Sequence, residues 1–115
     1  METAKTYRGR FAPSPTGPLH LGSLLAAMGS WLMARQADGQ WLIRIEDIDP
    51  PREIIGAANG QIETLKRFGM ESDEPVLWQS KRNQRYGEVL QKLLDSDEAF
   101  ECFCSRQDLL EQQGI

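Results

Sequence analysis

The sequence predicts an α/β fold, in which the strands of a parallel sheet alternate with helices that pack against it. Three observations support this class. Strand-like and helix-like stretches alternate along the 115 residues, the first strand-like stretch leads through a loop rich in proline and glycine into a helix, and no internal repeat is visible. The composition, with 40% hydrophobic and 26% charged residues, is that of a folded globular chain.

The first predicted unit is a strand, a loop, a helix and a second strand. A strand is expected over 7–12, and the segment 13–18 holds so much proline and glycine that it must be a loop. Apolar residues at spacings of three and four then predict an amphipathic helix that ends near Gly39. They are Leu21, Leu24, Leu25, Met28, Leu32 and Met33. The apolar run 41–45 predicts a central strand, covered on both faces and parallel to the first.

Two more helices and two more strands are expected in the rest of the chain. Apolar spacing predicts one helix that is closed by Gly69 and another around 86–94. The residues that mark them are Ala58, Ile62, Leu65 and Phe68, and then Tyr86, Val89, Leu90, Leu93 and Leu94. A short strand is expected at 76–78, and alternating side chains predict a last strand over 99–104.

The charge balance gives little sign of a nucleic-acid partner. A net charge of −4 argues weakly against a chain that neutralises phosphates over its whole surface, although basic residues gather at Lys81, Arg82 and Arg85. Apolar runs are only a few residues long, and residues 1–10 lack the features of a signal peptide. We therefore expect no membrane contact and a cytoplasmic location.

Two informative clusters of residues, at 10–23 and 44–52, lie where the first two predicted strands end. In a parallel sheet, ligands gather beyond the carboxyl ends of the strands, where helix N-termini offer free N–H groups. His20, the single histidine of the sequence, lies near Gly22 at such a helix start and could face a phosphate. An isolated His-x-Gly is more often a cap or a turn, so the functional interpretation depends on the longer segment around it.

That longer segment resembles a known signature. Arg-Phe-Ala-Pro-Ser-Pro-Thr-Gly at 10–17, followed by His-Leu-Gly at 20–22, resembles the first signature of class I aminoacyl-tRNA synthetases of the glutamyl and glutaminyl type. Arg-Ile-Glu-Asp at 44–47 resembles the Arg-Ile-Glu-Asp segment of the same family. The resemblance implies the N-terminal part of a Rossmann-like nucleotide-binding fold, with a parallel sheet and flanking helices.

Further residues resemble one shortened branch of this family, the glutamyl-Q tRNA(Asp) synthetases. They are Ile-Asp-Pro-Pro-Arg at 48–52, Trp-Gln-Ser at 78–80 and the Cys-x-Cys at 102–104. The branch activates glutamate with ATP to glutamyl-adenylate and pyrophosphate, then transfers glutamate to the queuosine base of tRNA(Asp). True glutamyl-tRNA synthetases transfer it to the terminal ribose instead, and usually carry a threonine where Ile48 stands. Mg²⁺ is expected with ATP.

The resemblance also implies roles for single residues. Arg10 would pair with a substrate carboxylate and Glu46 would accept the α-ammonium of glutamate. The implied glutamate site consists of Arg10, Phe11, Ala12, Pro13, Ser14 and Glu46. The implied ATP site consists of Pro13, Ser14, Thr16, Gly17, His20, Gly22 and Ser23, with His20 and Gly22 as the catalytic pair.

Plainer interpretations exist for the charged residues. Arg10 could form a surface ion pair, and Glu46, Asp47 and Asp49 could form a solvated acidic turn that caps a helix. The joint position of Arg10 and Glu46 at the ligand edge favours the functional interpretation for these two. For Asp47 and Asp49 the turn remains the favoured interpretation.

The resemblance divides the chain into 1–98, the N-terminal part of the catalytic domain, and 99–115, the start of a zinc-binding insertion. In this branch a pair such as Cys102 and Cys104 begins a Zn²⁺ site that a tyrosine and another cysteine complete further along. Two thiolates one residue apart are half of a tetrahedral site, and two partly buried free cysteines are the alternative.

Family members continue beyond this sequence, so we expect the chain to be incomplete as a catalyst. One alternative is a fragment of a true glutamyl-tRNA synthetase, and another is a non-catalytic binding module that has inherited the fold. A fragment that exposes a sheet edge should self-associate, whereas an adapted module should be monodisperse. Full-length family members are expected to be monomers.

Overall fold

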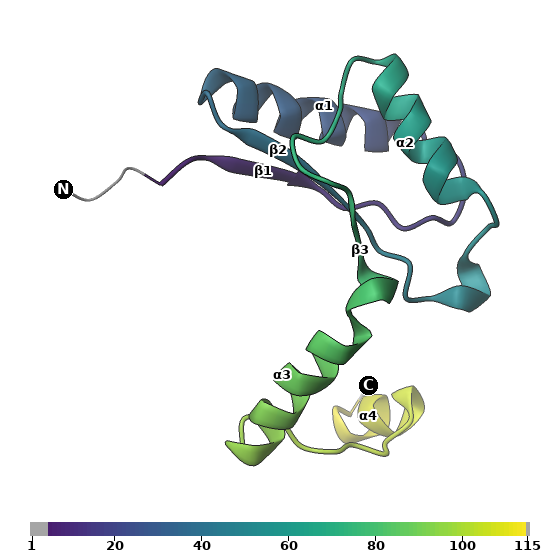
Figure 1. Cartoon of the computed structure of the whole chain (residues 1–115). Helices are drawn as coiled ribbons and strands as arrows, with labels where there is room; N and C mark the ends of the chain where they lie inside the picture. The colour runs from purple at the N-terminus through teal and green to yellow at the C-terminus, as the bar shows by residue number, and fades with distance from the viewer. Residues whose placement is uncertain (1–4, 115) are drawn as a thin grey trace. The chain divides into compact units, whose positions relative to one another are not determined.

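The computed structural model describes residues 5–114, which fall into two compact units. The first unit extends to Arg82 and the second begins at Asn83 (Figure 1). Residues 1–4 and residue 115 lie outside the described residues, so the expectation that 1–10 is not a signal peptide falls partly outside them. The sequence analysis predicted a different boundary, between a catalytic part at 1–98 and a zinc-binding insertion from 99 onward. That boundary stays a prediction.

In the first unit three parallel strands form a sheet in the order β1-β2-β3. The elements are β1 (Arg8–Phe11), α1 (Leu21–Gln36), β2 (Gln40–Ile45), the 3₁₀ turn η1 (Pro50–Arg52), α2 (Ala57–Arg67), β3 (Leu77–Trp78) and the 3₁₀ turn η2 (Gln79–Arg82). The register sets Arg8 opposite Gln40 and Arg44 opposite Leu77. The predicted strand, loop, helix and parallel strand are therefore confirmed.

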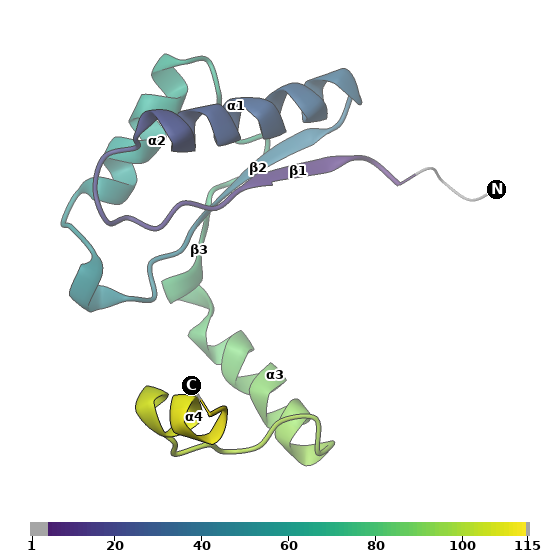
Figure 2. The ribbon, with the colours of Figure 1, turned by 180° about the vertical axis from the view of Figure 1, so that it is seen from behind.

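Both helices of this unit lie over the same face of the sheet (Figures 1 and 2). The core contains Ala27 and Ala34 of α1, Trp41, Ile43 and Ile45 of β2, Leu65 of α2, and Met70. Along β2 these buried residues alternate with half-buried ones, Leu42 and Arg44, whose side chains leave from the other face. The prediction that β2 is covered on both faces is therefore wrong for the residues described.

The face of α1 that contacts the sheet differs from the predicted apolar stripe. The helix buries its small residues Ala27 and Ala34, while most of the predicted stripe is exposed. The exposed members are Leu21, Leu25, Met28, Leu32 and Met33. The small residues allow a close approach to β1, because a Cβ added at Gly9 would lie 3.2 Å from that of Ala34. Apolar residues surround α1 on several sides, so their spacing could not identify the buried face.

Asp73 connects the end of α1 to β2. Its carboxylate accepts hydrogen bonds from Arg35 Nη1 and Nη2, at 2.7 and 3.0 Å, and from the backbone N–H of Trp41 at 2.7 Å. The bonds from Arg35, and after them the bond from Trp41, hold the pKa of Asp73 below its ordinary value. A carboxylate with a lowered folded-state pKa adds stability above its unfolded pKa, and this stability is lost as pH falls through the folded value.

Replacing Asp73 with asparagine should lower the free energy of unfolding at pH 7 by about 1–2 kcal/mol, because hydrogen bonds to a charged but partly exposed group are weakened. Urea denaturation between pH 7 and pH 3 measures the effect. The wild-type chain should lose stability toward acid pH, and its advantage over Asp73→Asn should shrink there. An advantage that stays constant over this range would show that the charge of Asp73 does not stabilise the fold.

The second unit contains two helices, α3 (Asn83–Asp95) and α4 (Arg106–Gln112). The predicted third helix is confirmed as α3, but the strand predicted over 99–104 is wrong, because these residues form no regular structure. Phe100 and Phe103 are largely exposed, so the alternation that suggested a strand buries neither aromatic ring. The helix α4 was not predicted from the sequence, and it begins at a capping box where the Asp108 N–H donates to Ser105 Oγ at 3.2 Å. Among residues 5–114 no helix is long and apolar enough to cross a membrane.

Candidate ATP and glutamate site

The two predicted clusters meet at the carboxyl edge of the sheet. β1 ends at Phe11 and β2 ends at Ile45, so the segments that follow them leave from neighbouring parallel strands. The backbone N–H of Glu46 donates to the carbonyl oxygen of Pro13 at 3.0 Å. The proline-rich loop after β1 is thereby fixed directly to the first residue after β2.

The loop 12–19 and the first turn of α1 enclose an open hollow of about 450 Å³, here called the loop hollow. All the residues predicted to contact ATP line it, and so do Phe11 and Ala12 from the predicted glutamate site. Gly17 has a φ of +153°, which disfavours other residues. The structure thus brings the predicted ATP residues together at the N-terminus of a helix of 16 residues.

His20 is the N-cap of α1. Its Nδ1 accepts a hydrogen bond from the backbone N–H of Ser23 at 3.2 Å, and its Nε2 lies 3.1 Å from Ser23 Oγ. A Cβ added at Gly22 would lie 3.1 Å from ring atoms of His20, so the glycine of His-x-Gly leaves room for the folded-back ring. The plain interpretation of His20 as a cap is therefore observed, and the ring is held in the wall of the loop hollow.

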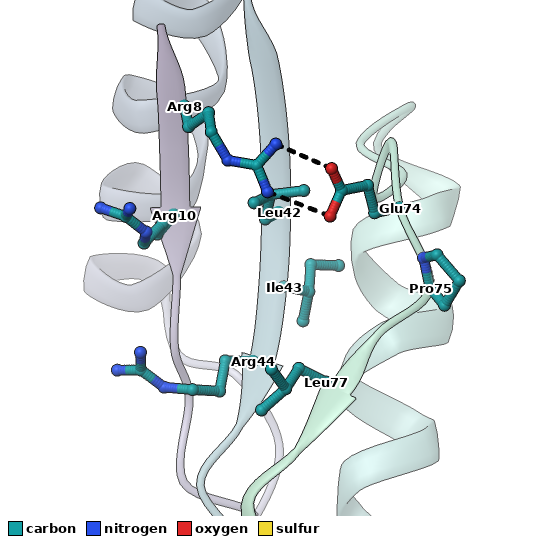
Figure 3. A pocket seen from close by; sticks show the side chains of 8 residues that line it. All are labelled: Arg8, Arg10, Leu42, Ile43, Arg44, Glu74, Pro75 and Leu77. Atoms are coloured by element: carbon teal, nitrogen blue, oxygen red, sulfur yellow. Dashed lines mark hydrogen bonds and ion pairs between the residues drawn. The ribbon is translucent and has the colours of Figure 1, made fainter. Parts of the chain in front are cut away.

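Arg10 and Glu46 do not line the loop hollow. Arg10 lies on the opposite face of the sheet in a second hollow of about 230 Å³, the arginine hollow, which also contains Arg8, Arg44 and Glu74. Figure 3 shows Arg8 reaching across β2 to Glu74, which it contacts at 2.7 and 3.0 Å. Arg10 and Phe11 are neighbours in one strand, so their side chains leave from opposite faces.

The carboxylate of Glu46 already has a basic partner. Arg44 Nη2 donates to Glu46 Oε1 at 2.8 Å, and both side chains are about one-third exposed or more. The ion pair lies at the end of β2, where the arginine hollow approaches the carboxyl edge of the sheet. A cationic group of a ligand would therefore either bind Glu46 together with Arg44 or take the place of Arg44.

Asp49 makes a local contact within the turn, whereas Asp47 contacts a residue 33 positions along the chain, which the turn interpretation did not predict. Asp47 accepts hydrogen bonds from the backbone N–H and the hydroxyl of Ser80, at 2.9 and 2.6 Å, and Asp49 pairs with Arg52. Desolvation raises the pKa of Asp47, but the bonds from Ser80 and the charge of Lys81 outweigh it, so the pKa is lowered.

One residue at the site was missed by the sequence analysis. The side chain of Gln61 on α2 is only 3% exposed, and its Nε2 donates to the carbonyl oxygens of Ser14 and Gly17 at 3.0 and 2.8 Å. Ala58, Ile62 and Leu65 predict the buried side of α2, and a glutamine lies among them in sequence. A polar residue at such a position is the signal that could have identified it.

Cys102 and Cys104 are both free and exposed. Within the described part of the chain, residues 5–114, no group of three or more potential ligands is arranged to hold a metal ion. Two thiolates supply half of a tetrahedral zinc site, so the residues present do not fit a closed zinc centre.

Comparison with known proteins gives one consistent family. Residues 6–115 match the family described as tRNA synthetases class I (E and Q), catalytic domain. The glutamyl-Q tRNA(Asp) synthetase of Xanthomonas campestris pv. campestris (strain 8004) is 62% identical over 109 residues, which are 95% of this chain and 37% of that protein. The protein of the same name from Shewanella oneidensis is 55% identical, over 95% of this chain and 36% of its own length.

A solved structure is also similar. The glutamate tRNA ligase from Elizabethkingia meningosepticum, determined in complex with its amino acid, superposes with a TM-score of 0.82 at 34% identity. The match covers 96% of this chain and 24% of that one. The chain spans a little more than a third of the length of the curated relatives it matches.

Proposed function

Because this chain belongs to the class I tRNA synthetases of the glutamate and glutamine type, we propose that it carries the first part of a site at which ATP activates glutamate. The observation that supports this most directly is the loop hollow, where all the predicted ATP residues surround the N-terminus of α1. The first N–H groups of a helix and its dipole favour a bound phosphate at that position.

The proposed reaction joins glutamate to the α-phosphate of ATP. An oxygen of the substrate carboxylate attacks the α-phosphorus, the bond to the bridging oxygen breaks, and pyrophosphate leaves with the electron pair. Negative charge develops on the phosphate oxygens during this step. N–H groups in the first turn of α1 and the ring of His20 would stabilise it, while the Ser23 N–H keeps the ring in place. Mg²⁺ would accompany ATP, and no residue of this chain is assigned to it.

Glutamate itself is proposed to bind where the arginine hollow approaches the carboxyl edge. Arg10 supplies a cation for a carboxylate, and Glu46 supplies an anion for the α-ammonium after it exchanges its contact with Arg44. The side chains of Arg10 and Phe11 leave from opposite faces of the sheet. This supports separate binding positions, with glutamate contacting Arg10 and ATP contacting the loop after Phe11.

The acceptor is proposed to be the queuosine base of tRNA(Asp), in the cytoplasm. The support is the name of the relatives at 55–62% identity, which is well above the 34% identity to a glutamate tRNA ligase. Transfer to the 3′ end of a tRNA is the second candidate, and the similarity to a glutamate tRNA ligase supports it. A zinc ion at Cys102 and Cys104 would require two more ligands, and no step depends on it.

Glutamate-dependent exchange between ATP and labelled pyrophosphate tests the proposal, with the Xanthomonas campestris relative as the positive control. Exchange by the 115-residue chain would show that these residues suffice for activation. Binding of ATP in calorimetry without exchange would support a partial site. Failure to bind either ATP or glutamate would contradict the proposal and favour a binding module with another ligand.

A further inference from the structure

We propose that Gln61 is a positioning residue, which holds the proline-rich loop in the shape that binds ATP. Its link to ATP rests on the function proposed above, whereas its link to the loop depends on contacts alone. The side chain comes from α2, which is distant in sequence from the loop, and it is almost completely buried behind the loop hollow.

The loop needs a donor from outside because of its own composition. Three of the six residues at 13–18 are proline, which has no backbone N–H, so the loop can form few hydrogen bonds within itself. The carbonyl oxygens of Pro13 and Pro15 accept from the backbone N–H groups of Glu46 and Ile54, both at 3.0 Å. Those of Ser14 and Gly17 accept from the amide Nε2 of Gln61, and the Ser14 oxygen also accepts from the Thr16 N–H at 2.9 Å, so among the described residues Gly17 depends on Gln61 alone.

The amide of Gln61 suits this position because its one nitrogen can donate to two carbonyl oxygens. Both carbonyl groups precede a proline, and one Nε2 joins them across the turn that contains Gly17. The opposite orientation of the amide would set Oε1 against two carbonyl oxygens, so these contacts assign the nitrogen to the loop. Oε1 is buried and has no hydrogen-bond partner among residues 5–114, which is a cost that the two bonds must offset.

Substitution by glutamate gives a test that depends on pH. The carboxyl group introduced by Gln61→Glu can donate to a loop carbonyl only when it is protonated, and its ionised form repels both oxygens. Burial and these contacts favour the neutral form, so its pKa should lie above the ordinary value for glutamate of about 4.3. The loop is therefore held at acid pH and released as pH rises through the raised pKa.

The affinity for ATP is measured by calorimetry from pH 5 to pH 8 and expressed as the ratio of variant to wild type, so that pH effects common to both chains cancel. We expect Gln61→Glu to bind about three- to fivefold more weakly than wild type at pH 5, where its single O–H replaces two N–H donors, and roughly ten- to thirtyfold more weakly at pH 8, where both hydrogen bonds are lost. Gln36→Glu, which adds the same charge at an exposed position on α1, is the matched control and should show a flat ratio.

A second measurement does not depend on ATP. The ¹³C shifts of the Ser14 and Gly17 carbonyls report whether they accept hydrogen bonds, and both should move in Gln61→Met, which keeps the size of the side chain but has no donor. Unchanged shifts in Gln61→Met, or a flat ratio for Gln61→Glu in a chain that binds ATP, would overturn the inference. If the wild-type chain does not bind ATP, the proposed function fails, and the carbonyl shifts alone decide whether Gln61 holds the loop.

Discussion

Replacing His20 with asparagine should weaken ATP binding by about tenfold to a hundredfold, because a hydrogen bond to a charged phosphate contributes about 1.5–3 kcal/mol. The same change should leave the stability of α1 nearly unaltered. Asparagine is among the best N-cap residues, and its side-chain oxygen can accept the Ser23 N–H that His20 Nδ1 accepts now. Calorimetric titration with ATP and urea denaturation measure the two quantities on the same samples.

His20→Ala is the matched control for the capping role. It removes both the ring and the cap, so it should lose ATP affinity as His20→Asn does and also about 1 kcal/mol of stability. If His20→Asn binds ATP as well as the wild-type chain does, the ring acts only as a cap. The proposed contact between His20 and phosphate would then be wrong.

Trp41→Ala should lower the free energy of unfolding by about 3–5 kcal/mol, which is the usual cost of truncating a buried aromatic residue. Trp41 is fully buried in β2, its ring stacks on Phe11 with centroids 6.4 Å apart, and its Nε1 donates to Ser30 Oγ at 2.9 Å. The substitution would therefore remove contacts between β2, β1 and α1 at once. Urea denaturation followed by circular dichroism measures the loss.

Phe100→Ala provides the comparison for Trp41→Ala. Phe100 is 85% exposed, so its truncation should change stability by no more than about 0.5 kcal/mol. A loss below about 1 kcal/mol for Trp41→Ala would contradict the described core, because it would show that the ring is not packed between the sheet and α1.

Local patterns predicted most of the fold, and the errors have physical causes. The loop at 13–18 and the helix that follows are encoded by residues close in sequence, so both are confirmed. The buried face of α1 depends on how closely Gly9 and Ala34 approach, which is a tertiary property that spacing does not record. The strand expected at 99–104 failed because alternating side chains form a strand only where a partner strand is available.

In the candidate site, too, the residues close together in sequence were predicted and those that depend on tertiary packing were not. The residues predicted to bind ATP all lie within 13–23, so predicting them together required only the motif and the start of a helix. Gln61 is far from the loop in sequence and reaches it only through the packing of α2. Arg10 was predicted in one pocket with Phe11, although the alternation of side chains along a strand separates the two.

The three prolines of the loop after β1 also affect the entropy of ligand binding. Each ring fixes φ in the unfolded chain as well as in the folded one. Such a restriction typically lowers the free-energy cost of ordering the chain by about 0.4–1 kcal/mol per residue. A loop restricted in this way has few alternative shapes to give up when a ligand arrives. The free energy of its contacts with the ligand is then available for affinity rather than for ordering the backbone.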